Sequence, residues 1–413
     1  MGGNEQKPII RFRGFTDSWE QRKLSEVADK VTEKNTDLNV QETFTNSAEF
    51  GVISQRDFFD HDISNAENIG GYYVVRNEDF VYNPRISVTA PVGPVNRNKL
   101  GRNGVMSPLY TVFRTHDLDT TYLEWFFKSS YWHPFMFFNG DSGARSDRFS
   151  IKDAVFFEMP IPVPGIEEQH QIGAYLDKLD NLITLHQREH DILVNVKKSM
   201  LERLFPREGS NVPEIRFAGF NNAWTQHKVT ELGDIYIGLV TTMTSHYTDH
   251  GTLLIRNSDI KDGRFQFGSN PIYLDDDFAK QNTSRKHRVG DVITVHTGDI
   301  GTSAVITEKE AGSIGFATIV TRPDKGKITS EFLCTYLNTD AHKNFAMNIS
   351  TGDGRNNYNL KDYYECIIPL PCIEEQKKIS SFVSGLNRLI NTHQHKLEKL
   401  QSIKASMLER MFV

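Results

Sequence analysis

Several short stretches of this 413-residue chain carry arginine and asparagine side chains of the kind that read bases in nucleic acids. Arginine makes two parallel hydrogen bonds to guanine, and asparagine makes two to adenine, in the major groove of DNA. Lysine and arginine also contact phosphates. Each residue alone is weak evidence, because most surface arginines are merely solvated. The candidate DNA-binding residues are Asn83, Arg85, Arg145, Arg148, Arg256, Asn257, Lys286, Arg288, Arg355, Asn356 and Asn357.

Two of these stretches occupy the same place in a sequence repeat. GARSDRFSIKD (143–153) precedes the proline stretch PIPVPGIEEQHQI (160–172), and GDGRNNYNLKD (352–362) precedes PLPCIEEQKKI (369–379). Both copies place glycine, arginine and polar residues before the Lys-Asp pair, although a structural turn would also explain the glycines. The repeated position favours a shared role over chance.

The repeat extends over most of the chain. IRFRGFTDSWEQRKLSEV (10–27) recurs as IRFAGFNNAWTQHKVTEL (215–232), and SMLER occurs at 199–203 and again at 406–410. The repeat is too long for a solenoid of short units. It predicts a tandem duplication of a whole domain followed by a helix.

The segment after each proline stretch has the heptad pattern of a long helix that packs along another helix. IEEQ supplies acidic residues for the first helical turn, where the helix dipole favours them. A duplicated unit closes most naturally about a two-fold axis, which makes the two helices antiparallel. An amphipathic helix lying on its own domain is the alternative. The predicted helix-helix interface consists of Ile172, Leu179, His186, Leu193, Met200, Ile379, Leu386, His393, Leu400 and Met407.

The predicted fold class is α+β with an internal pseudo-two-fold repeat. Two mixed α/β domains are joined by two long helices that form an antiparallel coiled coil. Strand-like runs such as YYVV (72–75) and DVITV (291–295) alternate with helical segments, and the two domain interiors barely resemble each other. The predicted globular domains span 1–165 and 207–372, and the predicted helices span 166–206 and 373–413.

Composition excludes several classes of protein. No apolar run approaches the ~18 residues of a membrane span, and the N-terminus lacks the apolar core of a secretory signal. Cys334, Cys366 and Cys372 form no CxxC, which favours a reducing cytoplasm and argues against disulfides or a zinc framework. We find no phosphate loop and no HExxH, so we expect no catalytic residue, cofactor or metal site. The net charge of −6 argues mildly against nucleic-acid binding by the chain alone.

In its layout the chain resembles the specificity subunit of type I DNA restriction-modification systems. The resemblance covers essentially the whole chain and rests on the repeated IRF-x-GF entry segment, the proline turn with IEEQ, the SMLER helix end, and RVGDVITVHTGDIG in the second half. It implies two target recognition domains that each read half of a split duplex DNA target, and two spacer helices. The implied partners are duplex DNA, two modification (adenine methyltransferase) subunits and a restriction (translocase-nuclease) subunit. The chain itself is then non-catalytic, and shares phosphate attraction with its partners.

Other functions stay open at this point. One alternative within the family is the specificity subunit of a related two-subunit system, in which modification and cleavage share one partner. An interaction scaffold for protein or RNA is a further alternative, and a self-contained enzyme is disfavoured by the missing catalytic motifs. The resemblance transfers no individual base contact, because recognition domains differ among members.

Overall fold

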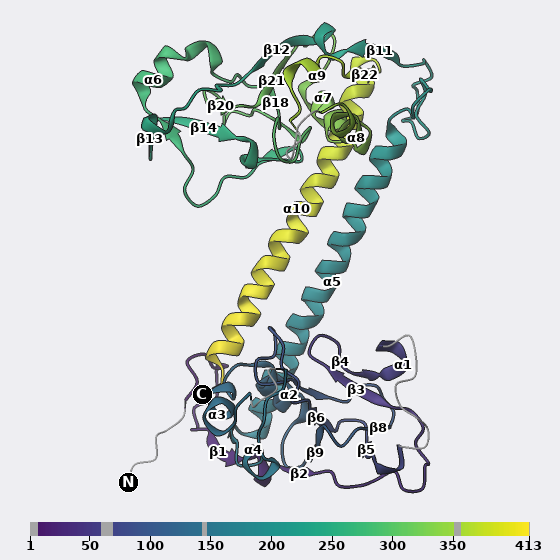
Figure 1. Cartoon of the computed structure of the whole chain (residues 1–413), viewed down its shortest axis with the longest axis vertical. Coiled ribbons are helices and arrows are strands. Elements are labelled where there is room, and N and C mark those ends of the chain that lie inside the picture. Colours follow the sequence, from purple (N-terminus) through teal and green to yellow (C-terminus); the bar gives the residue numbers. More distant parts are fainter. Residues whose placement is uncertain (1–6, 59–68, 143–146, 351–356, 413) are drawn as a thin grey trace. The chain divides into compact units, whose positions relative to one another are not determined.

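The computed structural model of the chain describes residues 7–58, 69–142, 147–350 and 357–412. The chain divides into two compact units, and each is described by itself below. The first unit comprises residues 1–187 and 395–413, and the second comprises residues 188–394. Each unit therefore contains one half of each long helix (Figure 1).

The first unit has the strands β2 (Ala28–Lys30), β3 (Phe44–Ser47), β4 (Gly51–Ser54), β5 (Tyr73–Val75), β6 (Phe80–Tyr82), β7 (Val95–Arg97), β8 (Gly104–Met106) and β9 (Thr111–Thr115). Its main sheet is antiparallel with the order β2-β9-β6-β7, and the pairs β3-β4 and β5-β8 share a core with it. The helices are α1 (Gln55–Phe58), α2 (Thr120–Lys128), α3 (His133–Asn139) and α4 (Asp153–Phe156).

Aromatic residues hold the sheet of the first unit against α2. All three residues of β6 are buried, and Phe80 stacks on Phe113 of β9 with ring centroids 5.4 Å apart. Asp119 caps α2 by accepting a hydrogen bond from the backbone N–H of Tyr122, which stabilises the helix start. The buried face of α2 includes Tyr122 and Trp125, so sheet and helix form one apolar core.

The second unit repeats this sheet with different residues. Its strands are β12 (Gly233–Ile237), β13 (Tyr247–Thr248), β14 (Thr252–Arg256), β15 (Ile260–Lys261), β16 (Arg264–Phe265), β17 (Tyr273–Leu274), β18 (Val292–Thr294), β19 (Ser303–Val305), β20 (Ile314–Phe316) and β21 (Ile319–Pro323). The order β12-β21-β18-β19 matches β2-β9-β6-β7, and a second sheet has the order β13-β17-β14-β20. The helices are α6 (Asp276–Gln281), α7 (Ser330–Leu337), α8 (Asp340–Ile349) and α9 (Leu360–Tyr363).

The repeated sequence segments pair with each other within each unit. The entry segment supplies one strand and the proline stretch supplies its antiparallel partner. In the first unit β1 (Glu20–Lys23) pairs with β10 (Pro160–Val163), and in the second β11 (Thr225–Lys228) pairs with β22 (Ile367–Leu370). Proline is tolerated because each pair is an isolated two-stranded sheet with edges.

The same segments are joined by a buried ion pair in each unit. Arg11 binds Glu168 through two hydrogen bonds of 2.7 and 2.8 Å, and Arg216 binds Glu375 through two of 2.8 Å. Both carboxylates are almost fully buried. The second glutamate of each IEEQ therefore holds the arginine of each IRF, a role that the helix dipole alone did not predict.

The long helices are α5 (Ile166–Leu204) and α10 (Ile373–Arg410), and they run antiparallel as predicted (Figure 1). In the first unit Ile172, near the start of α5, shares a core with Met407, near the end of α10. In the second unit Met200 packs in one core with Ile379. The predicted α+β class with two repeated domains and long helices is confirmed. Among the described residues, the helices include none apolar enough over a sufficient length to cross a membrane.

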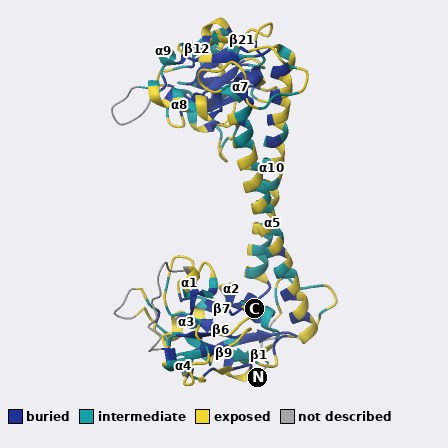
Figure 2. Cartoon of the chain, turned by 90° about the vertical axis from the view of Figure 1, so that its right-hand side faces the viewer, coloured by how far each residue is buried: buried dark blue, intermediate teal, exposed yellow. Residues whose placement is uncertain are grey.

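The end of each helix lies inside a domain core. Phe205 contacts Trp224 and Phe332 in the second unit, with ring centroids 5.9 and 5.5 Å away. Phe412 contacts Tyr122 and Phe126 in the first unit, at 5.7 and 5.8 Å. Figure 2 shows that the middle of each helix is exposed or half-buried, whereas the ends carry buried residues. Each repeated SMLER segment is therefore followed, two residues later, by a phenylalanine that completes a domain core.

Candidate nucleic-acid interface

In the first unit, the loop after β6 pairs with the segment before α4. The backbone N–H of Phe149 donates to the carbonyl of Pro84 at 2.7 Å, and the Phe149 side chain is buried. We call residues 83–87 and 147–150 the first loop pair. Backbone hydrogen bonds fix the two segments against each other.

Two of the predicted arginines become neighbours in the first loop pair. Arg85 and Arg148 are opposite each other in an antiparallel bridge, which puts their side chains on the same face. Arg85 is exposed and Arg148 half-buried, and neither guanidinium has a hydrogen bond or ion pair with the described residues. Two adjacent cations repel each other, so the arrangement favours an anion or a base edge with acceptors between them.

Asn83 has a structural role in the same loop. Its side-chain amide donates to the backbone carbonyl of Asn46 at 2.7 Å, and its side-chain oxygen accepts the N–H of Arg85 at 3.0 Å. A Cβ atom at Gly93 would lie only 2.1 Å from the carbonyl oxygen of Asn83, and Gly93 has a φ of +84°. Asn83 and Gly93 together shape the loop that presents Arg85.

The second unit contains an equivalent arrangement. The N–H of Tyr358 donates to the carbonyl of His296 at 2.9 Å, and Thr297 is opposite Asn357 in an antiparallel bridge. We call residues 296–301 and 357–359 the second loop pair. It follows β18 and precedes α9, just as the first loop pair follows β6 and precedes α4. Residues 147–150 and 357–359, the described parts of the two repeat copies before each Lys-Asp pair, thus take the same place in each unit.

Two predicted asparagines meet at the second loop pair. The hydroxyl of Thr297 donates to the side-chain oxygen of Asn357 at 3.0 Å. The side-chain oxygen of Asn257 accepts the N–H of His296 at 2.8 Å, and its amide donates to the carbonyl of Ala317 at 3.1 Å. Asn257 therefore braces the loop, whereas the amide of Asn357 makes no hydrogen bond with the described residues.

A buried histidine, His342, supports the second loop pair through Tyr358. The hydroxyl of Tyr358 donates to Nε2 of His342 at 3.2 Å, and Nδ1 of His342 donates to the carbonyl of Leu337 at 2.7 Å. Both ring nitrogens of the neutral imidazole are thus satisfied. Burial lowers the pKa of His342 to about 4, so the ring stays neutral at physiological pH.

Of the other basic residues of the prediction, Arg256, Lys286 and Arg288 are described, and they belong to neither loop pair. Arg256 makes two hydrogen bonds, of 3.0 and 2.9 Å, to the buried carboxylate of Asp259, and this pairing raises the pKa of Arg256. Lys286 and Arg288 flank the buried His287 near the start of β20, whereas Asn257 lies near its end. Arg145, Arg355 and Asn356 lie outside the described residues.

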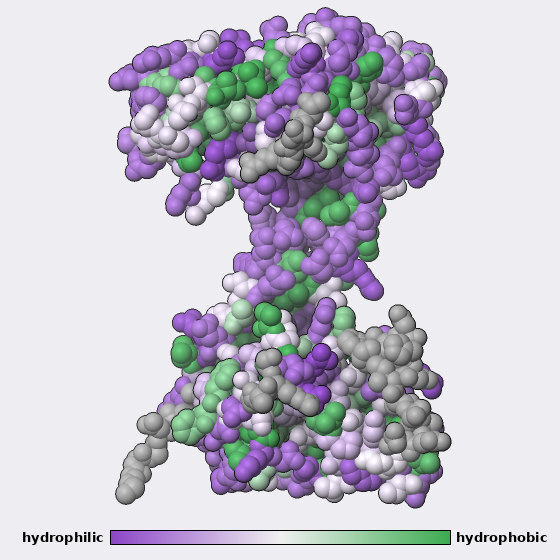
Figure 3. Space-filling view, viewed as in Figure 1, coloured by the Kyte–Doolittle hydropathy of each residue, from purple (hydrophilic) through white to green (hydrophobic). Residues whose placement is uncertain are grey.

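Sequence reasoning missed three exposed apolar residues beside the loop pairs. Phe138, on α3, is 90% exposed, and the adjacent Phe137, which is 57% exposed, makes an edge contact with Phe149 at 6.0 Å. Met347, on α8, is 49% exposed at the equivalent place in the repeat. Figure 3 shows hydrophobic patches scattered on a mostly hydrophilic surface. The run FMFF just before the glycine-rich segment was the available signal, and exposed aromatic residues beside basic loops suit apolar contacts with thymine methyl groups.

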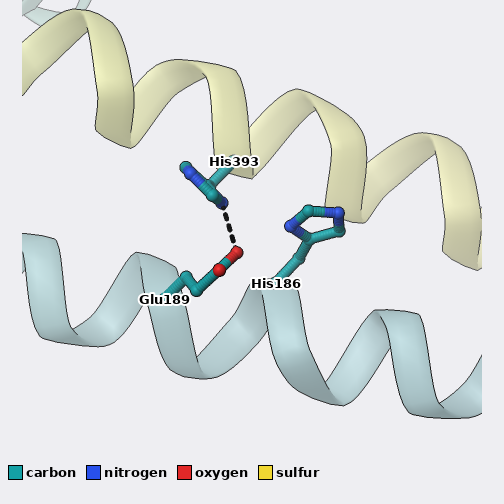
Figure 4. A group of neighbouring side chains, drawn as sticks. All are labelled: His186, Glu189 and His393. Carbon is teal, nitrogen blue, oxygen red and sulfur yellow. Dashed lines mark ion pairs between the residues drawn. The ribbon is translucent and has the colours of Figure 1, made fainter.

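The predicted interface residues of the helices have varied surroundings. Ile172, Leu179 and Ile379 are buried in the cores, and Leu386 is buried as well. The half-buried members are Leu193, Met200, His186, His393, Leu400 and Met407. Nδ1 of His393 lies 3.1 Å from the carboxylate of Glu189 (Figure 4).

Comparison with known proteins identifies the repeat. Residues 16–193 and 222–402 each match the family model described as the type I restriction modification DNA specificity domain. The chain is 22% identical over 266 residues to the type I restriction enzyme MjaVIII specificity subunit of Methanocaldococcus jannaschii, and the match covers 62% of each chain. It is 25% identical over 169 residues to the type I restriction enzyme EcoBI specificity subunit of Escherichia coli, covering 39% of this chain and 35% of the relative. The chain thus matches less than two thirds of the length of these relatives.

Solved structures share the fold. The S subunit of a type I restriction-modification system from M. genitalium superposes with a TM-score of 0.61 at 14% identity, over 99% of both chains. A chain from a structure on complex assembly and conformational transition of a type I R-M system gives a TM-score of 0.53 at 17% identity, over 94% of this chain and 96% of that one. At these identities the likeness is one of fold.

Proposed function

This chain belongs to the type I restriction-modification DNA specificity family, and we propose that it recognises a bipartite, asymmetric duplex DNA target. Residues 1–165 and 207–372 are the two target recognition domains, one for each half of the target. Residues 166–206 and 373–413 are the spacer helices that separate the half-sites.

The observation that carries this proposal is the pair of equivalent loop pairs with different side chains. The first presents Arg85 and Arg148, and the second presents Thr297 and Asn357. Arginine favours guanine edges or phosphate, whereas asparagine favours adenine. One backbone frame that carries two unlike sets of side chains supports two readers with different half-sites, and therefore an asymmetric target.

The predicted DNA-binding residues fall into groups according to the partners that each side chain has. Arg85, Arg148 and Asn357 are the leading candidates for base edges, because their guanidinium or amide donors are not engaged by described residues. Arg145, Arg355 and Asn356 remain proposed contacts from their place in the repeated glycine-rich segment. We assign Lys286 and Arg288 to phosphate, Asn83 and Asn257 to shaping the loop pairs, and Arg256 to holding the turn that ends at Asp259.

The chain itself supplies recognition and its partners supply chemistry. In this proposal two modification subunits dock on the helices and methylate adenine, and a separate restriction subunit translocates and cuts DNA. The names of the matched relatives, which are restriction-enzyme specificity subunits, support such partners. The net charge of −6 also fits a subunit that shares phosphate attraction with an assembly.

The test is to co-express the chain with its cognate modification subunit and to map methylated adenines by long-read sequencing. We expect a split motif in which two short specific half-sites flank an unspecified gap of fixed length. A continuous motif, or no methylation by a complex that assembles normally, would overturn the proposal. A catalytically dead modification subunit is the control for background methylation.

A further inference from the structure

The short hairpin of β15 and β16 reaches from the second domain to both long helices, and all of its contacts lie within the second unit. We call residues 260–265 the clamp hairpin. The ammonium group of Lys197, on α5, donates to the carboxylate of Asp262 at 2.6 Å. The guanidinium of Arg264 donates to the side-chain oxygen of Asn391, on α10, at 2.7 Å. One hairpin therefore holds α5 through one polar contact and α10 through another.

The clamp hairpin is fixed firmly to its own domain. Ile260 is buried in the same apolar core as Ile255 and Ile293. The backbone N–H of Gly263 donates to the carbonyl of Ser303, at the start of β19, at 3.0 Å. Gly263 has a φ of +70°, which glycine adopts without strain. The hairpin therefore moves with the domain, and its contacts with the helices pass to the domain.

The sequence repeat shows that the second unit uses a repeated lysine in a new way. Lys197 and Lys404 each stand two residues before SMLER. In the first unit Lys404, on α10, pairs with Asp180, on α5, so the lysine joins helix to helix. The second copy has Asn387 at the place of Asp180. An asparagine carries no charge, and Lys197 pairs with Asp262 of the clamp hairpin instead.

The clamp hairpin makes a second attachment between the domain and α5. The first attachment is Phe205, which packs in the domain core. Lys197 precedes Phe205 by about 12 Å along the helix axis, at 1.5 Å per residue. A cavity of about 710 Å³ lies between the hairpin, residues 338–343 and the two helices, so side chains do not fill this space. A single attachment at the helix end allows a domain to pivot, whereas a second one across a cavity fixes its angle.

We propose that the clamp hairpin restricts the DNA target to one gap length by fixing the angle between the second domain and its helices. This inference rests on the proposed function. One base pair added to the gap moves a half-site by about 3.4 Å and turns it by about 35°. A domain that pivots can follow such a shift, and a domain held at two points cannot. Lys197, Asp262, Arg264 and Asn391 are then positioning residues.

The experiment maps methylated adenines in complexes of the full-length chain with its modification subunit. The variant Lys197→Ala/Arg264→Ala removes both contacts of the clamp hairpin. It should methylate sites with a gap one base pair longer or shorter about tenfold faster, relative to the original gap, than the wild type does, which is the ratio given by one lost charge-assisted hydrogen bond. Both half-sites should stay the same, because no proposed base contact is changed.

Lys198→Ala is the matched control. Lys198 is the next residue of α5 and also pairs with the domain, through Asp340, but both side chains are more than half exposed. An exposed pair of this kind contributes little, so the gap should stay fixed in this variant. The charge exchange Lys197→Asp/Asp262→Lys should restore the single gap that Asp262→Lys alone loosens, which a general folding defect would not do.

The outcomes separate this inference from the proposed function. A wild-type complex without a split motif would overturn the proposed function. A split motif in the wild type, with the same single gap in an assembled Lys197→Ala/Arg264→Ala complex, would overturn the clamp alone. Lys197→Met and Arg264→Gln, which keep most of the side-chain volume, extend the test. If every one of these variants keeps its Tm but fails to assemble, the hairpin is a docking site for a subunit and the inference is wrong.

Discussion

At the scale of single residues, the decisive feature is the adjacency of Arg85 and Arg148. If each reads a base edge, substitution by alanine should weaken specific binding by the assembled complex by about 1–3 kcal/mol and relax one half of the target only. A phosphate contact would instead lower affinity for every sequence and flatten its dependence on salt. Arg76→Ala, which removes an exposed arginine paired with Glu33, is the matched control. Unchanged binding in both variants would place the contacts elsewhere.

Substitution of Phe138 tests whether the exposed aromatic side chain beside the first loop pair contributes to DNA binding. The major groove of duplex DNA offers apolar contact with thymine methyl groups, so Phe138→Ala should reduce DNA affinity severalfold without lowering Tm. Phe137→Ala should instead lower Tm, because Phe137 packs against Phe149. Equilibrium binding and thermal unfolding of both variants distinguish these roles. Full DNA affinity in Phe138→Ala would show that the ring contacts no base.

The two entry-segment tryptophans should respond differently to the same substitution. Nε1 of Trp19 donates to the buried carboxylate of Glu168 at 3.1 Å, whereas Nε1 of Trp224 is buried without a partner among the described residues. Both Trp→Phe changes lose similar packing, but only Trp19→Phe loses a hydrogen bond to a charge. We expect it to cost about 1.5–3 kcal/mol more. Hydrogen exchange of each unit measures the difference, and equal costs would contradict it.

The limits of sequence reasoning at this scale have a physical cause. Asn83 and Asn257 have the planar amide that reads adenine, yet the same amide bonds equally well to backbone groups, and in the structure it does so. The bridge between Arg85 and Arg148 joins segments that are far apart in the chain, so no local sequence pattern predicts it. The repeat did indicate that residues 147–153 and 357–362 take equivalent places in the two sheets, because a duplicated frame is visible in sequence.

At the scale of elements, the buried histidines of the second unit make its stability depend on pH. Burial lowers the pKa of His342 from 6.5 to about 4 in the folded chain. Below pH 6.5 the unfolded chain therefore binds a proton at this residue that the folded chain does not bind. His342 leaves the free energy of unfolding undiminished above pH 6.5 and lowers it as the pH falls toward 4. The full pKa shift corresponds to a decrease of about 3 kcal/mol in the free energy of unfolding. Unfolding of the second unit, followed by hydrogen exchange from pH 7 to 5, should show this loss.

His342→Gln supplies the control for this pH dependence. Glutamine does not titrate in this range, so the variant should lose stability less steeply as the pH falls. His287, whose pKa burial also lowers to about 4, should retain its share of the slope. An identical slope in the variant and the wild type would contradict the assignment to His342.

The elements differ in how visible they are in sequence. The long helices follow from heptads that recur over many turns, and their antiparallel pairing follows from the duplication. The sheet order β2-β9-β6-β7 does not follow from the sequence, because three of its four strands are only three residues long, too short for an alternating pattern to be read. Nor did sequence patterns show that Phe205 and Phe412 complete the domain cores.

At the scale of the whole molecule, two equivalent frames hold the two domains that we propose as readers of different half-sites. The repeated entry strand, proline strand, ion pair and helix end are nearly the same in both units. The loop pairs and the strands between them have diverged. Each proposed recognition domain has an apolar core of its own. We therefore expect that one domain can be replaced without disturbing the other.

The most direct test is to exchange one reader. Residues 28–142, together with the glycine-rich segment up to Ser150, are replaced by the equivalent stretch of another family member, and the co-expressed methyltransferase complex is used to map methylated adenines. The expected motif keeps the second half-site and the gap unchanged and takes its first half-site from the donor. A motif in which both half-sites change, or neither does, in a complex that assembles normally would contradict recognition of one half-site by each domain.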